Sequence, residues 1–142
     1  MGSISHTDRY CAALVGRAAD WAGIGLDLEP AAGLDADLWP EILTDAERAD
    51  LATLPTEAQP LAAKTVFCIK EAVYKAQYPV SRTLFGFHTL HVTVTAGGFS
   101  ARFLQGVPGF ALGRQVSGRL FCTRAVCGAL CWLPAGQVEK MP

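Results

Sequence analysis

The sequence shows little excess of charge and no long run of apolar residues. Twelve Lys and Arg nearly balance 13 Asp and Glu, which gives a formal net charge of −1. The overall charge therefore offers no attraction to nucleic acid or to a membrane surface. No apolar stretch is long enough to span a bilayer. The opening MGSISHTDRY lacks the basic start and apolar stretch of a signal peptide. We expect a cytoplasmic protein that binds neither nucleic acid nor membrane.

The sequence also lacks the closely spaced Cys and His pairs that are typical of zinc sites. The chain has only three histidines and no CxxC motif, and its cysteines are odd in number: Cys11, Cys68, Cys122, Cys127 and Cys131. A zinc site needs closely spaced Cys or His ligands, so this pattern argues against one. We expect all five cysteines to be reduced and buried, as is usual in the cytosol.

What is present is the composition of a globular protein. About half of the 142 residues (51%) are hydrophobic and 18% are charged, which is far from the composition of disordered chains. The length suits one ordinary domain, residues 1–142. No internal repeat or low-complexity linker divides the chain, so we expect one core.

The first half of the chain predicts one strand followed by two helices. Residues 5–8 form a short polar opening, and residues 10–19 suit either a strand or a short helix. Residues 23–30, GIGLDLEP, alternate as a strand that ends at Pro30. After a loop over 31–40, Thr44 and Glu47 form a capping box for a helix that ends near Pro55.

A second helix is predicted from Pro60 to Tyr78, with Pro79 ending it. Its buried stripe is formed by residues at helical spacing: Val66, Ile69, Val73 and Ala76. Residues 90–95 and 99–103 alternate as strands around a turn at Gly97–Gly98, and 120–133 predicts one or two buried strands. This order of elements indicates an α+β fold with an antiparallel sheet and packed helices.

Three carboxylates and a lysine are the candidates for chemistry. Asp27 and Glu29 leave the same face of the predicted strand, roughly 7 Å apart, and could bind Mg²⁺ or simply face water. Glu71 and Lys75 share a helix face, where they could form an ordinary surface ion pair. Taken together they suit a phosphate ligand, because Mg²⁺ usually keeps phosphate oxygens among its ligands and a lysine neutralises phosphate charge.

Four segments resemble the signatures of the 4′-phosphopantetheinyl transferase superfamily. GIGLDLEP is similar to its Gly-x-Asp-x-Glu motif, and FCIKEAVYK to its Lys-Glu-Ala motif, with Asp27 and Glu71 separated by 44 positions as in the family. SISH resembles the Ser-His motif of the larger, surfactin- and enterobactin-synthase-type members, and LTDAE a segment between the two signatures. This resemblance implies a transferase-like lobe that corresponds to the C-terminal part of the pseudo-dimeric larger members.

The resemblance also implies a reaction. The family transfers the 4′-phosphopantetheine arm of coenzyme A to a serine of an acyl or peptidyl carrier protein, in siderophore, peptide or polyketide synthesis. In this chain the implied Mg²⁺ ligands are Asp27, Glu29 and Glu71. The implied contacts to the coenzyme A phosphates come from Ser5, His6, Lys70 and Lys75. Glu71 is the expected base for the serine, Lys75 stabilises developing charge, and Glu47 is a second catalytic candidate besides its capping role.

The chain departs from the larger members because its Ser-His motif begins at residue 3, so the resemblance leads us to expect that the lobe that normally precedes it is missing. Three interpretations follow: a truncated reading of a complete transferase, a short active form that self-associates through the surface left by the missing lobe, or an inactive remnant that binds metal, coenzyme A or a carrier protein. An unrelated α+β protein with a Ca²⁺- or Mg²⁺-binding acidic face is the remaining alternative.

Overall fold

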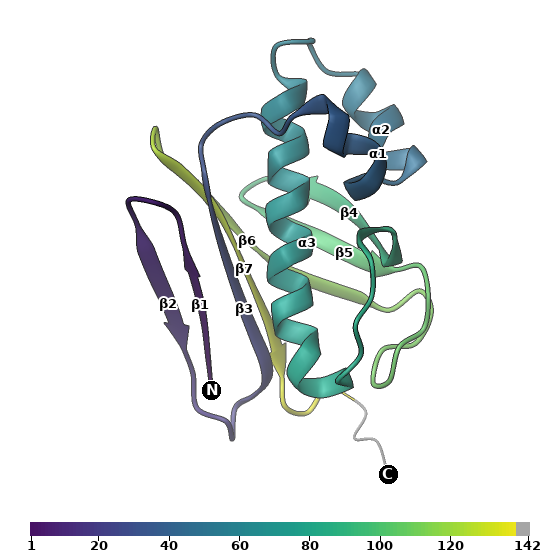
Figure 1. Ribbon diagram of the computed structural model, residues 1–142. Coiled ribbons are helices and arrows are strands. Elements are labelled where there is room, and N and C mark those ends of the chain that lie inside the picture. Colours follow the sequence, from purple (N-terminus) through teal and green to yellow (C-terminus); the bar gives the residue numbers. More distant parts are fainter. Residues whose placement is uncertain (139–142) are drawn as a thin grey trace.

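A five-stranded antiparallel sheet carries one long helix on one face, and a separate two-stranded hairpin flanks it (Figure 1). The computed structural model describes residues 1–138. The strand order in the large sheet is β3-β7-β6-β5-β4, while β1 pairs with β2. The predicted α+β class with an antiparallel sheet and packed helices is confirmed.

The elements are β1 (Gly2–His6), β2 (Cys11–Val15), β3 (Trp21–Pro30), η1 (Ala36–Leu38), α1 (Trp39–Ile42), α2 (Asp45–Ala52), α3 (Gln59–Ser81), η2 (Phe87–Thr89), β4 (Leu90–Thr95), β5 (Gly98–Phe103), β6 (Gln115–Cys122) and β7 (Val126–Pro134).

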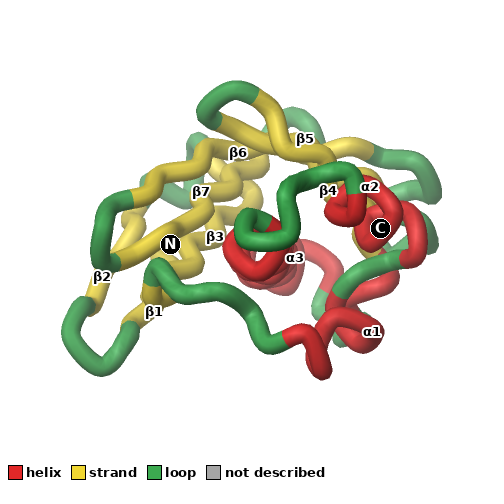
Figure 2. The backbone as a smooth tube through the Cα atoms, turned by 90° about the horizontal axis from the view of Figure 1, so that it is seen from above, coloured by secondary structure: helices red, strands yellow, loops and turns green. Residues whose placement is uncertain are grey.

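Helix α3 forms the centre of the core. Seen from above, the large sheet curves around α3, with the β1–β2 hairpin on one flank and α1 and α2 on the other (Figure 2). The predicted stripe of α3 is buried, since none of its members is more than 4% exposed: Val66, Ile69, Val73 and Ala76. Burying a side chain the size of Ile69 contributes roughly 1.5–3 kcal/mol, so this stripe holds the helix on the sheet.

The predicted end of α3 is wrong by about one turn. Pro79 lies inside the helix, which continues to Ser81 and ends at Arg82, a left-handed residue with φ 52°. Pro79 has no N–H to donate to the carbonyl four residues earlier, so α3 continues past it with the loss of one helical hydrogen bond. Arg82 N then donates to Tyr78 O at 2.9 Å, so the chain closes the helix after the proline.

Helix α2 begins as its capping box predicts. Thr44 Oγ1 accepts a hydrogen bond from Glu47 N at 3.2 Å, and Glu47 Oε2 accepts one from Thr44 N at 2.8 Å. The segment before it, predicted as a loop leading into a helix, contains the short η1 and α1. The capping box is the local sequence feature that starts α2, because it satisfies two backbone donors that a helix end leaves free.

The amino-terminal strand was missed by the sequence prediction. Residues 5–8 were expected to be a polar opening, but Gly2–His6 forms β1, and the ambiguous segment after it forms the strand β2. Ser3 and Ser5 are both 8% exposed and point towards β3. Because the inward residues of β1 are hydroxyls and not apolar side chains, hydropathy alternation gives no sign of this strand.

The remaining strands follow the predicted alternation. Strands β4 and β5 pair around Gly97, whose φ of 73° suits a glycine, and the predicted segment 120–133 divides into β6 and β7. All five cysteines are free thiols, yet Cys11 and Cys122 are exposed, so the expected burial is wrong for these two. In residues 1–138 no helix is both long and apolar enough to cross a membrane.

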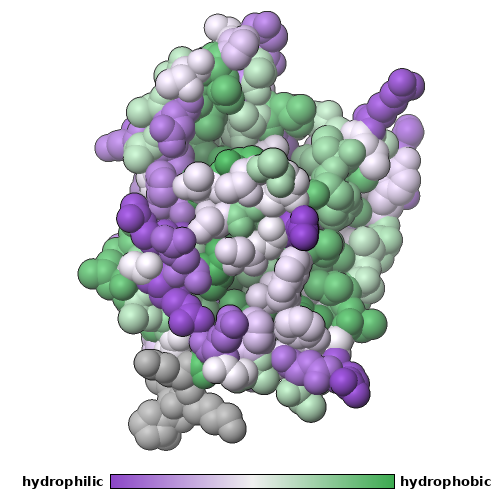
Figure 3. Space-filling view, turned by 180° about the vertical axis from the view of Figure 1, so that it is seen from behind, coloured by the Kyte–Doolittle hydropathy of each residue, from purple (hydrophilic) through white to green (hydrophobic). Residues whose placement is uncertain are grey.

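Hydrophobic side chains are not confined to the core. Seen from behind, hydrophobic residues form a band along the flank that carries the β1–β2 hairpin (Figure 3). On the outer side of that hairpin, Ile4 is 64% and Val15 is 80% exposed. The hairpin therefore presents an apolar surface on its side away from β3.

Candidate active site

Asp27 is one of the three carboxylates predicted to bind Mg²⁺ and is almost fully buried. It lies on β3 and is 3% exposed. Its Oδ1 accepts hydrogen bonds from Lys75 Nζ at 2.7 Å and from Ser5 Oγ at 3.1 Å. Its other oxygen, Oδ2, is buried and has no hydrogen-bond partner in the described residues. Because a buried carboxylate oxygen without a partner is unfavourable, Oδ2 is the atom at this site best suited to receive a cation.

Strand β1 closes the free edge of β3 with hydroxyl groups. Ser3 Oγ accepts from Leu26 N at 2.9 Å, and Ser5 Oγ accepts from Leu28 N at 3.0 Å while donating to Asp27. Ser5 is thus brought to the site, where its hydroxyl hydrogen is engaged by Asp27. His6 follows on the opposite, exposed side of β1. Sequence reasoning missed Ser3, whose only signal is its spacing of two residues from Ser5.

Two glycines of β3 let α3 come close to the strand. A Cβ at Gly23 or Gly25 would lie 1.9 Å from the backbone oxygen of Ala76 or Ala72, respectively, so neither position tolerates a side chain without movement. The close packing of β3 and α3 has a signal in the sequence, which is the small size of Gly23, Gly25, Ala72 and Ala76. The sequence prediction did not use this signal. The close contact of β3 and α3 brings Lys75 Nζ within 3.1 Å of Leu26 O and onto Asp27.

The negative charge of Asp27 affects the pKa values of Glu29 and Glu71. Burial raises the pKa of the Glu71 carboxyl above its usual value, and the negative charge of Asp27 raises it further, while Lys75 opposes the rise. Burial and then Asp27 also raise the pKa of Glu29, which pairs with Lys64 at 3.4 Å. The three carboxylates therefore repel one another, and a bound cation would reduce this repulsion.

In the described residues, Asp27, Glu29 and Glu71 do not form a complete metal-binding cluster. Within residues 1–138 no three His, Cys, Asp or Glu side chains stand close enough together to hold a metal ion. Their chemistry nevertheless fits a hard divalent cation, which prefers carboxylate oxygens, and Asp27 Oδ2 is an oxygen without a partner. The predicted ligand set of Asp27, Glu29 and Glu71 remains a prediction.

An apolar cleft of about 150 Å³ adjoins Glu71. It lies between α3 and the segment that follows it. Its lining is formed by Lys70, Glu71, Tyr74, Phe85, Gly86, Phe87 and Leu90. Tyr74 packs edge-on against Phe85, with ring centroids 5.4 Å apart. A flexible ligand chain that enters this cleft would reach Glu71 at its border.

Lys70 and Glu47 make no hydrogen bond to Asp27, Glu29 or Glu71 in the described residues, although Lys70 lines the same cleft as Glu71. Both side chains are 1% exposed and form an ion pair of 2.8 Å in the core. Lys70 also donates to Ile42 O and Phe87 O, so its three ammonium hydrogens are all engaged. The sequence prediction gave Lys70 a phosphate contact and Glu47 a catalytic role, and this geometry favours neither, because neither charged group is free to meet a ligand.

The model of the 4′-phosphopantetheinyl transferase superfamily matches residues 23–130. The chain belongs to the 4′-phosphopantetheinyl transferase superfamily. The match to this superfamily covers most of β3 and all of α3, which carry Asp27, Glu29, Glu71 and Lys75, whereas Ser5 and His6 lie before it.

Three similar proteins carry the name of the superfamily's activity. The chain is 34% identical over 108 residues to the 4′-phosphopantetheinyl transferase PptT of Mycobacterium tuberculosis, covering 74% of this chain and 47% of the relative. It is 36% identical over 93 residues to Npt of Nocardia iowensis, covering 66% and 41%. It is 34% identical over 122 residues to Svp of Streptomyces mobaraensis, covering 83% and 49%. The chain thus spans less than half of each of these relatives.

Proposed function

We propose that this chain carries the acidic centre of a Mg²⁺-dependent 4′-phosphopantetheinyl transferase, which acts in the cytoplasm. The reaction would transfer the 4′-phosphopantetheine arm of coenzyme A to a serine of an acyl or peptidyl carrier protein. The observation that carries the proposal is the buried Asp27, held by Lys75 and Ser5 with Oδ2 unpartnered, beside Glu29 and Glu71. Membership of the superfamily and the names of the three relatives support it.

Asp27, Glu29 and Glu71 would hold the Mg²⁺. Bound there, the ion would supply Lewis-acid stabilisation of the negative charge that develops on the pyrophosphate of coenzyme A. Burial raises the pKa values of Glu29 and Glu71, and the charge of Asp27 raises them further, so a bound divalent cation would relieve both effects. Lys75 would hold the Asp27 carboxylate in place through its hydrogen bond while it neutralises phosphate charge.

Glu71 is the best-placed base for the carrier serine. A serine hydroxyl is a weak nucleophile and has to lose its proton as it attacks phosphorus. Without bound metal, burial and the charge of Asp27 raise the pKa of Glu71, which makes its carboxylate a better proton acceptor than an exposed one. The serine oxygen would form the new bond to phosphorus, its proton would pass to Glu71, and the leaving group would be adenosine 3′,5′-bisphosphate. The apolar cleft beside Glu71 suits the flexible arm of the substrate.

The chain would be a relative of the larger, surfactin- and enterobactin-synthase-type members. Its matches span less than half of each relative, and Ile4 and Val15 leave an apolar surface on the hairpin. Self-association of the chain would use this surface. His6, which is exposed on the same side of β1, would then contribute to binding the coenzyme A phosphates.

The test is a direct assay of transfer. The full chain, coenzyme A, Mg²⁺ and an apo carrier protein are incubated, and the carrier is weighed by intact mass spectrometry. The expected result is a gain of one phosphopantetheine group, lost in Asp27→Asn and Glu71→Gln but kept in Glu41→Gln, which removes an exposed carboxylate of α1. No gain with the wild-type chain would reject the transferase function. Retained binding of Mg²⁺ or coenzyme A in that case would favour the inactive remnant.

A further inference from the structure

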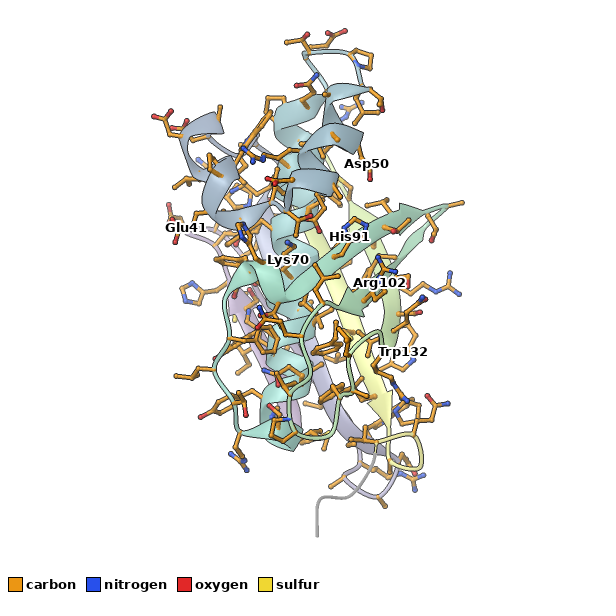
Figure 4. The ribbon with its side chains drawn as sticks, turned by 90° about the vertical axis from the view of Figure 1, so that its right-hand side faces the viewer. Glu41, Asp50, Lys70, His91, Arg102 and Trp132 are labelled. Atoms are coloured by element: carbon orange, nitrogen blue, oxygen red, sulfur yellow. The ribbon has the colours of Figure 1, made fainter. Side chains whose placement is uncertain are left out.

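The buried ion pair of Lys70 and Glu47 connects four parts of the chain around α3. Lys70 Nζ donates to Glu47 Oε2 at 2.8 Å, to Ile42 O at the end of α1 at 2.8 Å, and to Phe87 O in η2 at 3.0 Å. Viewed from the side of α1, α2 and β4, Lys70 lies in the middle of these elements (Figure 4). An ammonium group with three engaged hydrogens is fully satisfied without solvent or ligand.

Glu47 completes the same network from its other side. Its Oε1 accepts a hydrogen bond from Val92 N in β4 at 2.7 Å, and its Oε2 accepts one from Thr44 N at 2.8 Å. Each charge is therefore balanced both by the partner and by backbone groups. A buried pair of this kind is tolerated only when its remaining donors and acceptors are satisfied, as they are here.

The network of Lys70 and Glu47 adjoins the candidate active site, both in the sequence and in the folded structure. Lys70 precedes Glu71 in α3, so the two side chains leave the helix roughly 100° apart. Phe87, whose carbonyl accepts from Lys70, lines the apolar cleft together with Glu71. Anchoring Lys70 in the core therefore orients α3 about its axis and holds one wall of that cleft.

We propose that Lys70 and Glu47 are positioning residues, a buried clamp that sets the direction of Glu71 and the wall of the neighbouring cleft. The clamp itself rests on geometry, while its effect on turnover rests on the proposed transferase function. A phosphate contact by Lys70 would require the ammonium group to leave Glu47, which would strand a carboxylate that is 1% exposed. Such a buried unpaired charge is strongly unfavourable, so the clamp and the phosphate contact exclude each other.

A double-variant cycle in urea tests the clamp without any assay of activity. Lys70→Met and Glu47→Gln are each expected to lower the unfolding midpoint clearly, because each leaves one partner unpaired. The double variant is expected to lose less than the two single losses combined, since both charges are then gone. If a single variant does not fold, recovery of folding in the double variant gives the same answer.

A matched control uses the exposed pair on the same helix α2. Asp45→Asn, Arg48→Met and their double variant remove an ion pair in which the Asp45 side chain is 94% exposed. These losses are expected to be small and additive. Small, additive losses in the Lys70 and Glu47 variants as well would overturn the clamp.

Ligand binding and turnover separate positioning from phosphate contact. Under conditions in which Lys70→Met is fully folded, its affinity for adenosine 3′,5′-bisphosphate, measured by calorimetry, is expected to stay within about twofold of wild type. Its kcat is expected to fall about tenfold or more, because small misplacements of a base are costly. Lys75→Met is the comparison and is expected to weaken bisphosphate binding.

Three other results would count against parts of the proposal. Bisphosphate affinity weakened in Lys70→Met with kcat unchanged would restore the phosphate contact and overturn the positioning role. An unchanged kcat together with unchanged affinity would leave the clamp purely structural. If wild-type protein transfers nothing, the proposed function and the positioning role fail together, while the urea cycle still decides the clamp.

Discussion

Lys75 Nζ lies 2.7 Å from Asp27 Oδ1 and 3.1 Å from the carbonyl oxygen of Leu26, although 48 positions separate Lys75 from Asp27. This contact ties the helix that carries Glu71 to the strand that carries Glu29. It also provides the cation that a carboxylate at 3% exposure requires. The two signature segments of the sequence thus meet through this ion pair.

Removing Lys75 should destabilise the protein. Lys75→Met leaves Asp27 buried without its cation, so we expect the free energy of unfolding in urea to fall by roughly 1–3 kcal/mol. Arg17→Met is a suitable control, because Arg17 pairs with Asp20 at 2.8 Å but its side chain is 84% exposed. That exposed pair should contribute less than about 0.5 kcal/mol. Equal losses in the two variants would show that Asp27 needs no partner.

The stability contributed by Glu71 should depend on pH in a defined direction. Burial and the charge of Asp27 raise the pKa of Glu71 in the folded protein above 4.5, so the folded state holds this proton more tightly than the unfolded state. The free energy of unfolding then falls as pH rises through the raised pKa, and this penalty is absent below the unfolded value. Glu71→Gln removes the penalty.

Glu71→Gln should therefore be more stable than wild type at pH 8 when no divalent ion is present. The difference between the two proteins should narrow as pH falls towards 4.5. Urea unfolding of both proteins over this range measures it, and Glu41→Gln controls for loss of an exposed carboxylate. A difference that stays constant, or that grows towards low pH, would mean that Glu71 is not held in a repulsive environment.

Mg²⁺ should stabilise the folded chain by binding at the carboxylates. An ion concentration ten times its dissociation constant stabilises by about 1.4 kcal/mol, which corresponds to a rise in Tm of about 3–5 °C for a domain of this size. Asp27→Asn should abolish the rise, and a chelator should reverse it in wild type. Potassium chloride at matched ionic strength controls for screening. An equal rise in Asp27→Asn would place any bound ion elsewhere.

The contact between β3 and α3 should not tolerate an added methyl group at Gly25. A Cβ there would lie 1.9 Å from Ala72 O, so Gly25→Ala forces the helix away from the strand. We expect a loss of roughly 1–3 kcal/mol or more in the free energy of unfolding. Gly136→Ala is the matched control, since nothing lies within 4 Å of its Cβ position. Similar stability in both variants would mean that α3 does not need this close approach.

Local patterns were enough to predict much of the fold. The capping box at Thr44, the apolar stripe of α3 and the alternation of β3, β4 and β5 all appear as predicted. Each of these depends on residues that are near one another in the sequence. The prediction failed at β1 because the inward side chains, Ser3 and Ser5, act by hydrogen bonding to a strand more than 20 positions away. It failed at Pro79 because a proline in the last turn removes only one bond.

The sequence by itself determined which faces carry charge: Asp27 and Glu29 alternate on one side of a strand, and Glu71 and Lys75 share one side of a helix, because backbone periodicity is a local property. Tertiary structure decided what each lysine of FCIKEAVYK does. Lys70 and Lys75 differ by roughly 140° around α3. One meets the core, where Glu47 and two carbonyl groups engage it, and the other meets Asp27. That division follows from how the helix packs between the sheet, the hairpin and α2, which no pattern within one segment contains.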